Sequence, residues 1–185
     1  FTRIGSGVQP MTTGMIDQLY AGRVRHSLRN IPAPTTLKLT FQQLKIYYQE
    51  KGFEINDTFL HNLDLYVPDS ERLNYAAYLL ADTNSISIKV AKYAGTDKCD
   101  LIENEEYGYC SLIKATYRVL DKLEIENRTL TRITGAAARE QRRLFNARAL
   151  REALINAIIH NDYTAEVWPL VEIYSDRISI TSYGG

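Results

Sequence analysis

The sequence of 185 residues has few cysteines, no long apolar run and no excess of either charge. Its two cysteines, Cys99 and Cys110, have no histidine nearby, so we expect free thiols in a reducing compartment, with a disulfide or a metal site as the alternative. No apolar run approaches the roughly 18 residues that a membrane span needs, and the first residues lack an apolar signal segment. We therefore expect a cytoplasmic protein without a membrane partner.

Several catalytic motifs are also absent. There is no Gly-x-x-x-x-Gly-Lys-Ser/Thr phosphate loop and no acidic strand end of the Walker B type, and a translocating motor needs both. The sequence contains neither a Gly-x-Ser-x-Gly nucleophile elbow nor the ligand spacing of a zinc site. These absences argue against a helicase motor, an α/β-hydrolase and a zinc enzyme.

The composition, 45% hydrophobic and 24% charged, is that of a globular chain that can form one large or two small domains. The net charge of zero hides an uneven distribution. Lys and Arg outnumber acids by seven to two in residues 1–51, acids outnumber them by fourteen to seven in residues 52–127, and residues 128–185 have eight basic residues against six acids. The basic first segment is compatible with contact to nucleic acid, although a solvated face has the same composition.

Helix and linker signals organise the first half of the chain. Thr12 or Thr13 can cap a helix that runs to about Arg25. Pro32 and Pro34 prevent a helix over residues 30–36, which we interpret as a linker. Thr40 can cap a helix over residues 41–51 that Gly52 ends, and a short helix follows over residues 57–61. Residues 74–80 and 86–93 are rich in β-formers and predict a hairpin, so this region has the outline of a winged helix.

The second half alternates helices and strands. Apolar residues at helical spacing predict an amphipathic helix over residues 109–126, and residues 129–133 resemble a strand. Residues 135–143 form a connector with three basic residues, all arginine, which either binds phosphate or is simply solvated. Asn146 can cap a helix over residues 147–160, and residues 171–174 and 178–181 predict a strand pair.

The helix predicted over residues 147–160 is the segment with the most chemical information. It is apolar nearly all round, which predicts burial, yet Glu152, Asn156 and His160 recur every four residues and fall along one narrow stripe. Polar groups on a buried helix must be satisfied. Either the stripe belongs to a structural hydrogen-bond network, or it faces a ligand pocket in which Glu152 accepts a proton from water and Asn156 holds a hydrated metal ion.

This stripe and the segments around it resemble a known family. The residues that carry the resemblance are Glu152, Asn156, Ala157 and His160, followed by Asn161, Asp162 and Tyr163, and then Asp176, Arg177, Ser182, Tyr183, Gly184 and Gly185. They resemble the N-box and the start of the G1 box of GHKL ATPases, and more narrowly the RecG-related family of transcriptional regulators. The first seven residues together with Pro10 are similar to the end of the AlbA-like Schlafen-type domain that precedes the GHKL-like domain in that family.

The resemblance implies roles for individual residues. Glu152 would activate the attacking water as a general base. Asn156 would coordinate the Mg²⁺ that bridges the phosphates of ATP. Gly184 and Gly185 would let the backbone approach the nucleotide closely. The aspartate that reads the adenine amino group in the family has no counterpart, and Ser182 stands nearest to its place; the lid and the second glycine box would follow Gly185.

Taken together, the sequence predicts an α/β fold with α+β character. We expect the tail of an AlbA/Schlafen-like domain in residues 1–30, a helix and β-hairpin region in residues 37–135, and the start of a GHKL-like α/β sandwich in residues 144–185 of a longer protein. The expected function is that of a DNA-binding transcriptional regulator. The alternatives are an ATP-binding or ATP-hydrolysing protein and a non-catalytic scaffold that forms a homodimer.

Overall fold

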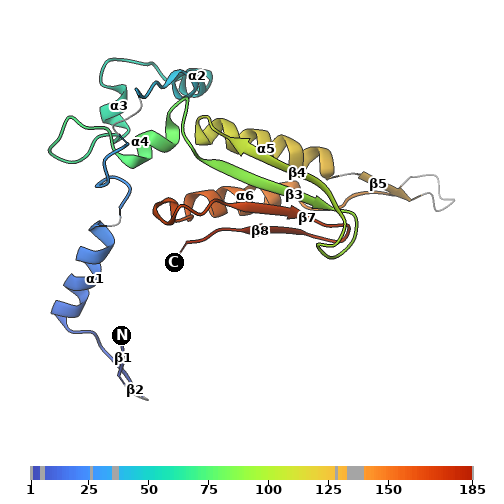
Figure 1. Ribbon diagram of the computed structural model, residues 1–185, viewed down its shortest axis with the longest axis horizontal. Coiled ribbons are helices and arrows are strands. Elements are labelled where there is room, and N and C mark those ends of the chain that lie inside the picture. The colour runs from blue at the N-terminus through green and yellow to red at the C-terminus, as the bar shows by residue number, and fades with distance from the viewer. Residues whose placement is uncertain are drawn as a thin grey trace. The chain divides into compact units, whose positions relative to one another are not determined.

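Figure 1 shows the computed structural model, which describes residues 2–4, 7–25, 27–34, 38–127, 129–132 and 140–184. Its mixed α and β architecture confirms the expected fold class. The chain divides into two compact units: Phe1–Leu39 with Tyr48–Leu79, and Thr40–Tyr47 with Leu80–Gly185. Residues 37–135, predicted as one region, contribute to both units, and whether the three predicted segments are separate domains stays a prediction.

The first unit begins with an antiparallel strand pair, β1 (Thr2–Ile4) and β2 (Gly7–Gln9). The helix predicted next is confirmed as α1 (Thr13–Arg25), and the Thr12 hydroxyl accepts a hydrogen bond from the amide of Met15 at 3.4 Å. Gly52 follows α2 (Gln42–Glu50) as expected, and its φ of 84° is a conformation that glycine adopts without strain. The short helix α3 (Phe59–Asn62) comes next.

The strand predicted over residues 74–80 is wrong, because these residues form the helix α4 (Tyr75–Leu80). Asn74 is fully buried, and its Oδ1 accepts a hydrogen bond from the amide of Ala77 at 3.0 Å, which satisfies a free N–H in the first turn of α4. Its Nδ2 donates to the carbonyls of Asp64 and Tyr66 at 2.7 and 3.1 Å. A single buried amide therefore caps the helix and fixes the preceding loop, and this outweighs the β propensity of the two tyrosines.

The second unit contains a four-stranded mixed sheet in the order β4-β3-β7-β8. Its strands are β3 (Ser87–Tyr93), β4 (Leu101–Gly108), β7 (Leu170–Ile173) and β8 (Ile178–Thr181). The predicted pairing of residues 171–174 with 178–181 is confirmed. β3 pairs antiparallel with β4, which the sequence did not predict, and parallel with β7.

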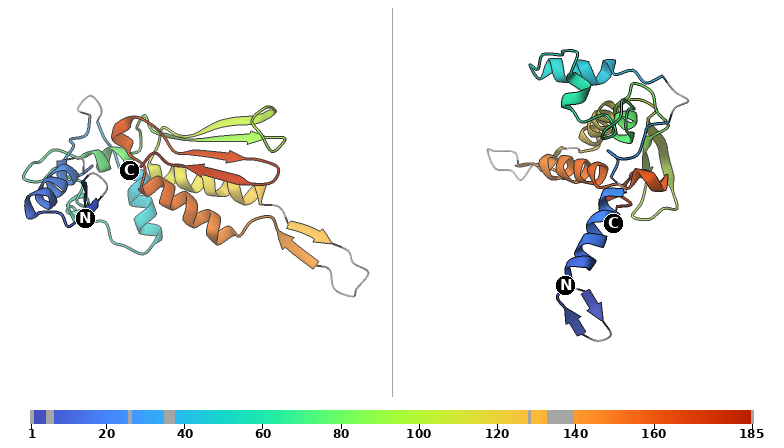
Figure 2. Two further views of the ribbon diagram at one scale, coloured as in Figure 1. Left: turned by 90° about the horizontal axis from the view of Figure 1, so that it is seen from below. Right: turned by 90° about the vertical axis from the view of Figure 1, so that its left-hand side faces the viewer.

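Two helices, α5 (Leu112–Glu126) and α6 (Ala147–Ile159), cover one face of this sheet (Figures 1 and 2). The apolar core between the helices and the sheet includes Ile88, Val90, Ala115, Val119, Leu123, Leu154, Ile158, Val171 and Ile173. Burial of one such Leu, Ile or Val side chain stabilises the fold by about 1.5–3 kcal/mol. Among the described residues, no helix combines the length and the apolar character that crossing a bilayer requires.

A second antiparallel pair, β5 (Thr129–Arg132) and β6 (Glu140–Arg143), forms a separate two-stranded sheet between α5 and α6. We call these two strands the β5–β6 arm. In Figures 1 and 2 the arm extends past the ends of both helices. The strand predicted from residue 129 is confirmed, whereas the last part of the predicted connector is strand β6; residues 133–139 lie outside the described residues.

The N-terminus of α2 is capped by a residue 40 positions away in the sequence. The carboxylate of Asp82 accepts hydrogen bonds from the Thr40 hydroxyl at 2.6 Å and from the amides of Gln42 and Gln43 at 2.8 and 2.7 Å. Burial favours the neutral acid, but these hydrogen bonds outweigh it, so the pKa of Asp82 lies below its usual range. Thr40, predicted as the cap, instead donates its hydroxyl to the residue that caps the helix.

Replacing Asp82 with Asn should lower the free energy of unfolding by about 1–2 kcal/mol, because the amide keeps one acceptor oxygen and its nitrogen cannot accept a hydrogen bond from the remaining donors. Since the folded pKa is depressed, the stabilisation is complete above the unfolded value of about 3.9 and is lost as the pH falls through the folded value. Urea unfolding at about pH 7 and about pH 3 measures both effects. The control is Asp57→Asn, since the exposed Asp57 carboxylate has no hydrogen-bond partner among the described residues. A deficit of equal size at both pH values would contradict this account.

Candidate functional site

The predicted polar stripe lies on α6, and the helix begins where the sequence predicts. The side chain of Asn146 accepts hydrogen bonds from the amides of Arg148 and Ala149 at 3.0 and 3.2 Å. The face of α6 with Leu154 and Ile158 packs into the core. Because residues four apart share one face of a helix, Glu152, Asn156 and His160 all point away from the core, and all three are exposed. The expectation that α6 is buried all round is therefore wrong.

The exposure of the stripe argues against the first of the two interpretations that the sequence left open, a buried structural network. Glu152 is paired with Arg148 at 2.9 Å, one turn earlier, and both side chains are largely in solvent. Such an exposed pair contributes about 0.3–0.5 kcal/mol, so it is not a structural requirement. Among the described residues, the side chains of Asn156 and His160 have no hydrogen-bond partner. The stripe is not a buried structural network, and its polar atoms are available to a ligand.

The residues directly after the stripe do have structural roles. Asn161 is buried; its Nδ2 donates to the carbonyl of Val167 at 2.8 Å and its Oδ1 accepts from the amide of Tyr183 at 3.0 Å. The hydroxyl of the buried Tyr163 donates to the carbonyl of Ile158 at 2.9 Å, and burial raises its pKa. Sequence patterns assigned these residues no individual role, because their partners are backbone groups that only the fold brings near.

These contacts bring the chain after β8 against the end of α6. A Cβ atom on Gly184 would lie 1.8 Å from the carbonyl oxygen of His160, so only glycine fits there. Gly184 therefore has a packing role in addition to the nucleotide approach that the resemblance implies. Ser182 is half-buried just before it, and Gly185 lies outside the described residues. Of the predicted site residues, the structure thus places Glu152 and Asn156 along α6 and Gly184 against the end of the same helix.

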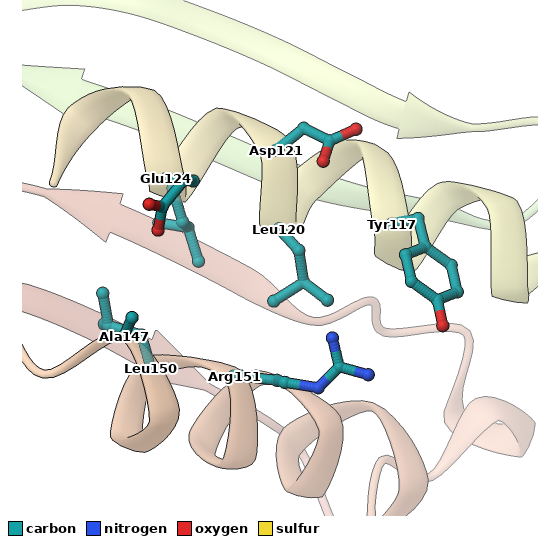
Figure 3. Close-up of a pocket in the computed structure, with 8 residues that line it drawn as sticks. Tyr117, Leu120, Asp121, Glu124, Ala147, Leu150 and Arg151 are labelled. Carbon is teal, nitrogen blue, oxygen red and sulfur yellow. The ribbon is translucent and has the colours of Figure 1, made fainter.

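Two hollows flank the first half of α6. The first, of about 330 Å³, lies between α5 and α6 (Figure 3). Leu120 and Leu150 line it, and the Arg151 guanidinium points toward Tyr117, 5.9 Å from the centre of the ring. The second hollow, of about 500 Å³, is lined by apolar residues of α6 and β8 such as Ala153 and Ile180. None of the predicted site residues lines either hollow.

Asn156 is the stripe residue to which the resemblance assigns the metal ion. Within the described residues, no group of three or more His, Cys, Asp or Glu side chains could hold a metal ion on its own. Mg²⁺ bound with a nucleotide takes most of its ligands from phosphates and water, and it needs only one or two from protein. The free amide oxygen of Asn156 fits that requirement, and it would hold a nucleotide-bound Mg²⁺. Both cysteines are free thiols, as expected.

Two carboxylates of the second unit with largely buried side chains, Glu126 and Glu172, form ion pairs within the fold. Glu126 contacts Lys92 at 2.9 Å and Lys122 at 3.3 Å, at the C-terminal end of α5. Burial raises the pKa of Glu126, but the hydrogen bonds from the two lysines lower it more, so the net shift is downward. On the face of the sheet away from α5 and α6, the buried carboxylate of Glu172 is paired with Lys98 at 2.5 Å. Neither group belongs to the stripe.

Comparisons with known proteins identify a similar fold. No protein family model and no curated protein matches the chain. Among solved structures, the DIP2311 protein of Corynebacterium diphtheriae matches over 99% of this chain, with 19% sequence identity and a TM-score of 0.65. This chain spans 38% of the length of that protein. At this identity the match shows a shared fold and nothing about activity.

The packing of Gly184 yields a stability prediction. Gly184→Ala should lower the free energy of unfolding of the second unit by about 1–3 kcal/mol, because the new methyl group would displace the end of α6. Gly95→Ala is the matched control, since Gly95 also belongs to the second unit and no atom lies closer than 3.9 Å to a Cβ there. Urea unfolding of both variants measures the effect, and equal stability of the two variants would contradict the close packing at Gly184.

Proposed function

We propose that this chain belongs to a DNA-binding transcriptional regulator rather than to a helicase motor. The observation that carries the proposal is the basic character of residues 128–151. This segment contains seven arginines, no lysine and one acid, Glu140. It comprises the β5–β6 arm and the first turns of α6. The resemblance to the RecG-related regulators points the same way.

Arginine is well suited to this partner, because its planar guanidinium donates paired hydrogen bonds to phosphate oxygens. Arg143, Arg148 and Arg151 are all exposed. Arg143 and Arg148 are paired with Glu124 and Glu152, and exposed pairs of this kind are worth so little that a phosphate can replace the carboxylate. Arg151 has no ion-pair partner among the described residues.

DNA binding is tested by fluorescence anisotropy with a labelled duplex of random sequence, at salt concentrations from about 50 to 200 mM. We expect log Kobs to fall linearly with log salt, by about 0.9 for each phosphate contacted. The double variant Arg148→Gln/Arg151→Gln should flatten that slope by about two contacts. Binding that is absent, or that does not depend on salt, would contradict the proposal.

A second candidate function is the binding of Mg²⁺-ATP along α6, favoured by the exposed stripe with its free Asn156 side chain. In that case Asn156 would hold the metal ion, Glu152 would orient or deprotonate water, and the segment from Ser182 to Gly184 would approach the nucleotide. When bound, Mg²⁺ would supply positive charge that offsets the charge of the phosphates. Because Ser182 stands in place of the adenine-reading aspartate, recognition of the base would be weak, and nucleotide binding is a more reasonable expectation than hydrolysis.

Nucleotide binding is tested by recording amide NMR spectra while Mg²⁺-ATP is added to the chain. We expect shifts that centre on Asn156, that require Mg²⁺, and that disappear in Asn156→Ala. The matched control is Asn104→Ala, since Asn104 is exposed on β4 and its side chain has no hydrogen-bond partner among the described residues. Shifts that persist without Mg²⁺, or in Asn156→Ala, would rule out this assignment of the metal ligand.

A further inference from the structure

The strand β8 forms an open edge of the four-stranded sheet. In the order β4-β3-β7-β8 the two edges are β4 and β8, and Figure 1 shows them on opposite sides of the sheet. An edge strand presents unpaired N–H and C=O groups, which can pair with a further strand. Among the described residues, no strand pairs with the outer side of β8.

The hairpin of β7 with β8 defines which backbone groups point outward. The amide of Tyr174 donates to the carbonyl of Arg177 at 2.9 Å, so these two residues form a bonded pair. Bonded and non-bonded pairs alternate along antiparallel strands, and the non-bonded positions on β8 are therefore Ile178 and Ile180. The N–H and C=O groups of Ile178 and Ile180 consequently point away from β7, toward the open edge.

The two edges of the sheet differ in charge. β4 contains Glu103, Glu105 and Glu106, and charged side chains on an edge oppose its pairing with another strand. Residues 178–184, which comprise β8 and the chain just after it, contain neither a charged side chain nor a proline. The β4 edge is thus protected against pairing, whereas the β8 edge has none of these protecting features.

An apolar hollow lies beside the β8 edge. Ile178 and Ile180 pack partly against the core, and they also line the hollow of about 500 Å³ between β8 and α6. Leu144, with 41% of its surface exposed, lines the same hollow. On α6 the lining residues include Ala149 and Ala153, whose small side chains allow another helix to approach closely. Covering this hollow would remove apolar surface from water.

We propose that β8 pairs antiparallel with β8 of a second copy of this chain, about a two-fold axis at Ser179, so that the two four-stranded sheets become one continuous sheet. In this register Ile178 lies opposite Ile180 of the second copy, and each outward backbone group gains a partner. Ser179 lies opposite the same residue across the axis. We call the line along which the two strands meet the seam.

The charges near the seam are compatible with a second copy. Arg177 would lie opposite Thr181 of the second copy, and Asp176 would lie opposite Ser182, so no like charges meet. Opposite residues of an antiparallel pair share one face of the sheet, which places both α6 helices on the same side. The two hollows then adjoin across the seam. One association therefore covers both open edges and both hollows, and it is independent of the proposed DNA binding.

Cysteine cross-linking tests the register, in the full chain with Cys99→Ser and Cys110→Ser. Opposite residues of a non-bonded pair have Cα atoms about 4.5 Å apart, so Ser179→Cys should form a disulfide-linked dimer. Thr181→Cys is the matched control, because Thr181 is half-buried on the same face of β8 but its two copies would be roughly 13 Å apart along the strands. Under mild oxidation, non-reducing electrophoresis should show dimer forming at least about tenfold faster in Ser179→Cys. Equal rates in the two variants would overturn the inference.

Light scattering of the unmodified chain tests the association without a cross-link. We expect the molar mass of a dimer, and that of a monomer for Ser179→Lys, which places like charges directly opposite each other. Asn104→Lys is the control, since Asn104 is exposed on β4, and it should leave the dimer intact. Thermal unfolding checks the fold of each variant. The cysteine comparison adds no charge to the seam, so it remains decisive should the lysine variant not fold.

A monomeric wild-type chain would overturn the inference, and one further measurement then identifies the other occupant. A synthetic peptide of alternating isoleucine and serine is added while amide NMR spectra are recorded. Shifts centred on Ile178 and Ile180 in a monomeric chain would mean that the β8 edge binds a separate strand and not a second copy.

Discussion

The parallel pairing of β3 with β7 is the constraint on which the second unit depends. These strands lie far apart in the sequence. β4 returns the chain to the end of the sheet at which β3 begins, and β7 starts at that same end after the chain has passed through α5 and α6. Apolar residues on α5 and α6 make it favourable to place both helices on one face of the sheet. The core around Val90 and Val171 is the result. The positions of the arm and of the polar stripe both follow from it.

The stripe on α6 shows how packing turns a sequence pattern into a surface. One side of the helix buries Leu154 and Ile158, and the helical period then directs Glu152 and Asn156 to solvent. The motif that follows the helix contributes to architecture: Asn161 and Tyr163 hold the loop, and Gly184 fits against the helix end. The segment that resembles a nucleotide-binding motif thus divides into a part that packs within the fold and a part whose polar side chains lie in solvent.

The charged residues also divide into two groups: one group is paired within the fold, and the other is concentrated in the arginine-rich segment around the start of α6. The acids of the middle of the chain include Glu103, which contacts Lys122, and Glu126, which also contacts Lys92, so part of that charge is neutralised within the fold. Of the arginines in residues 128–151, Arg143 lies at the end of β6, and Arg148 and Arg151 lie on the exposed start of α6. A net charge of zero is therefore compatible with a strongly basic local surface, which is what the interaction with a polyanion requires.

The sequence by itself determined the elements whose signals are local: the helix caps at Thr12 and Asn146, the stop at Gly52, the amphipathic pattern of α5 and the strand pair at the end of the chain.

The predictions from sequence that were wrong have a common cause, since each depends on a partner distant in sequence. Asn74 converts an expected strand into α4 by bonding to a loop ten residues earlier, and Asp82 caps α2 from 40 residues away. The hairpin of β3 with β4 and the exposure of the stripe were likewise decided by the tertiary structure. Periodicity fixes which residues share a face of a helix, whereas only packing decides which face is buried.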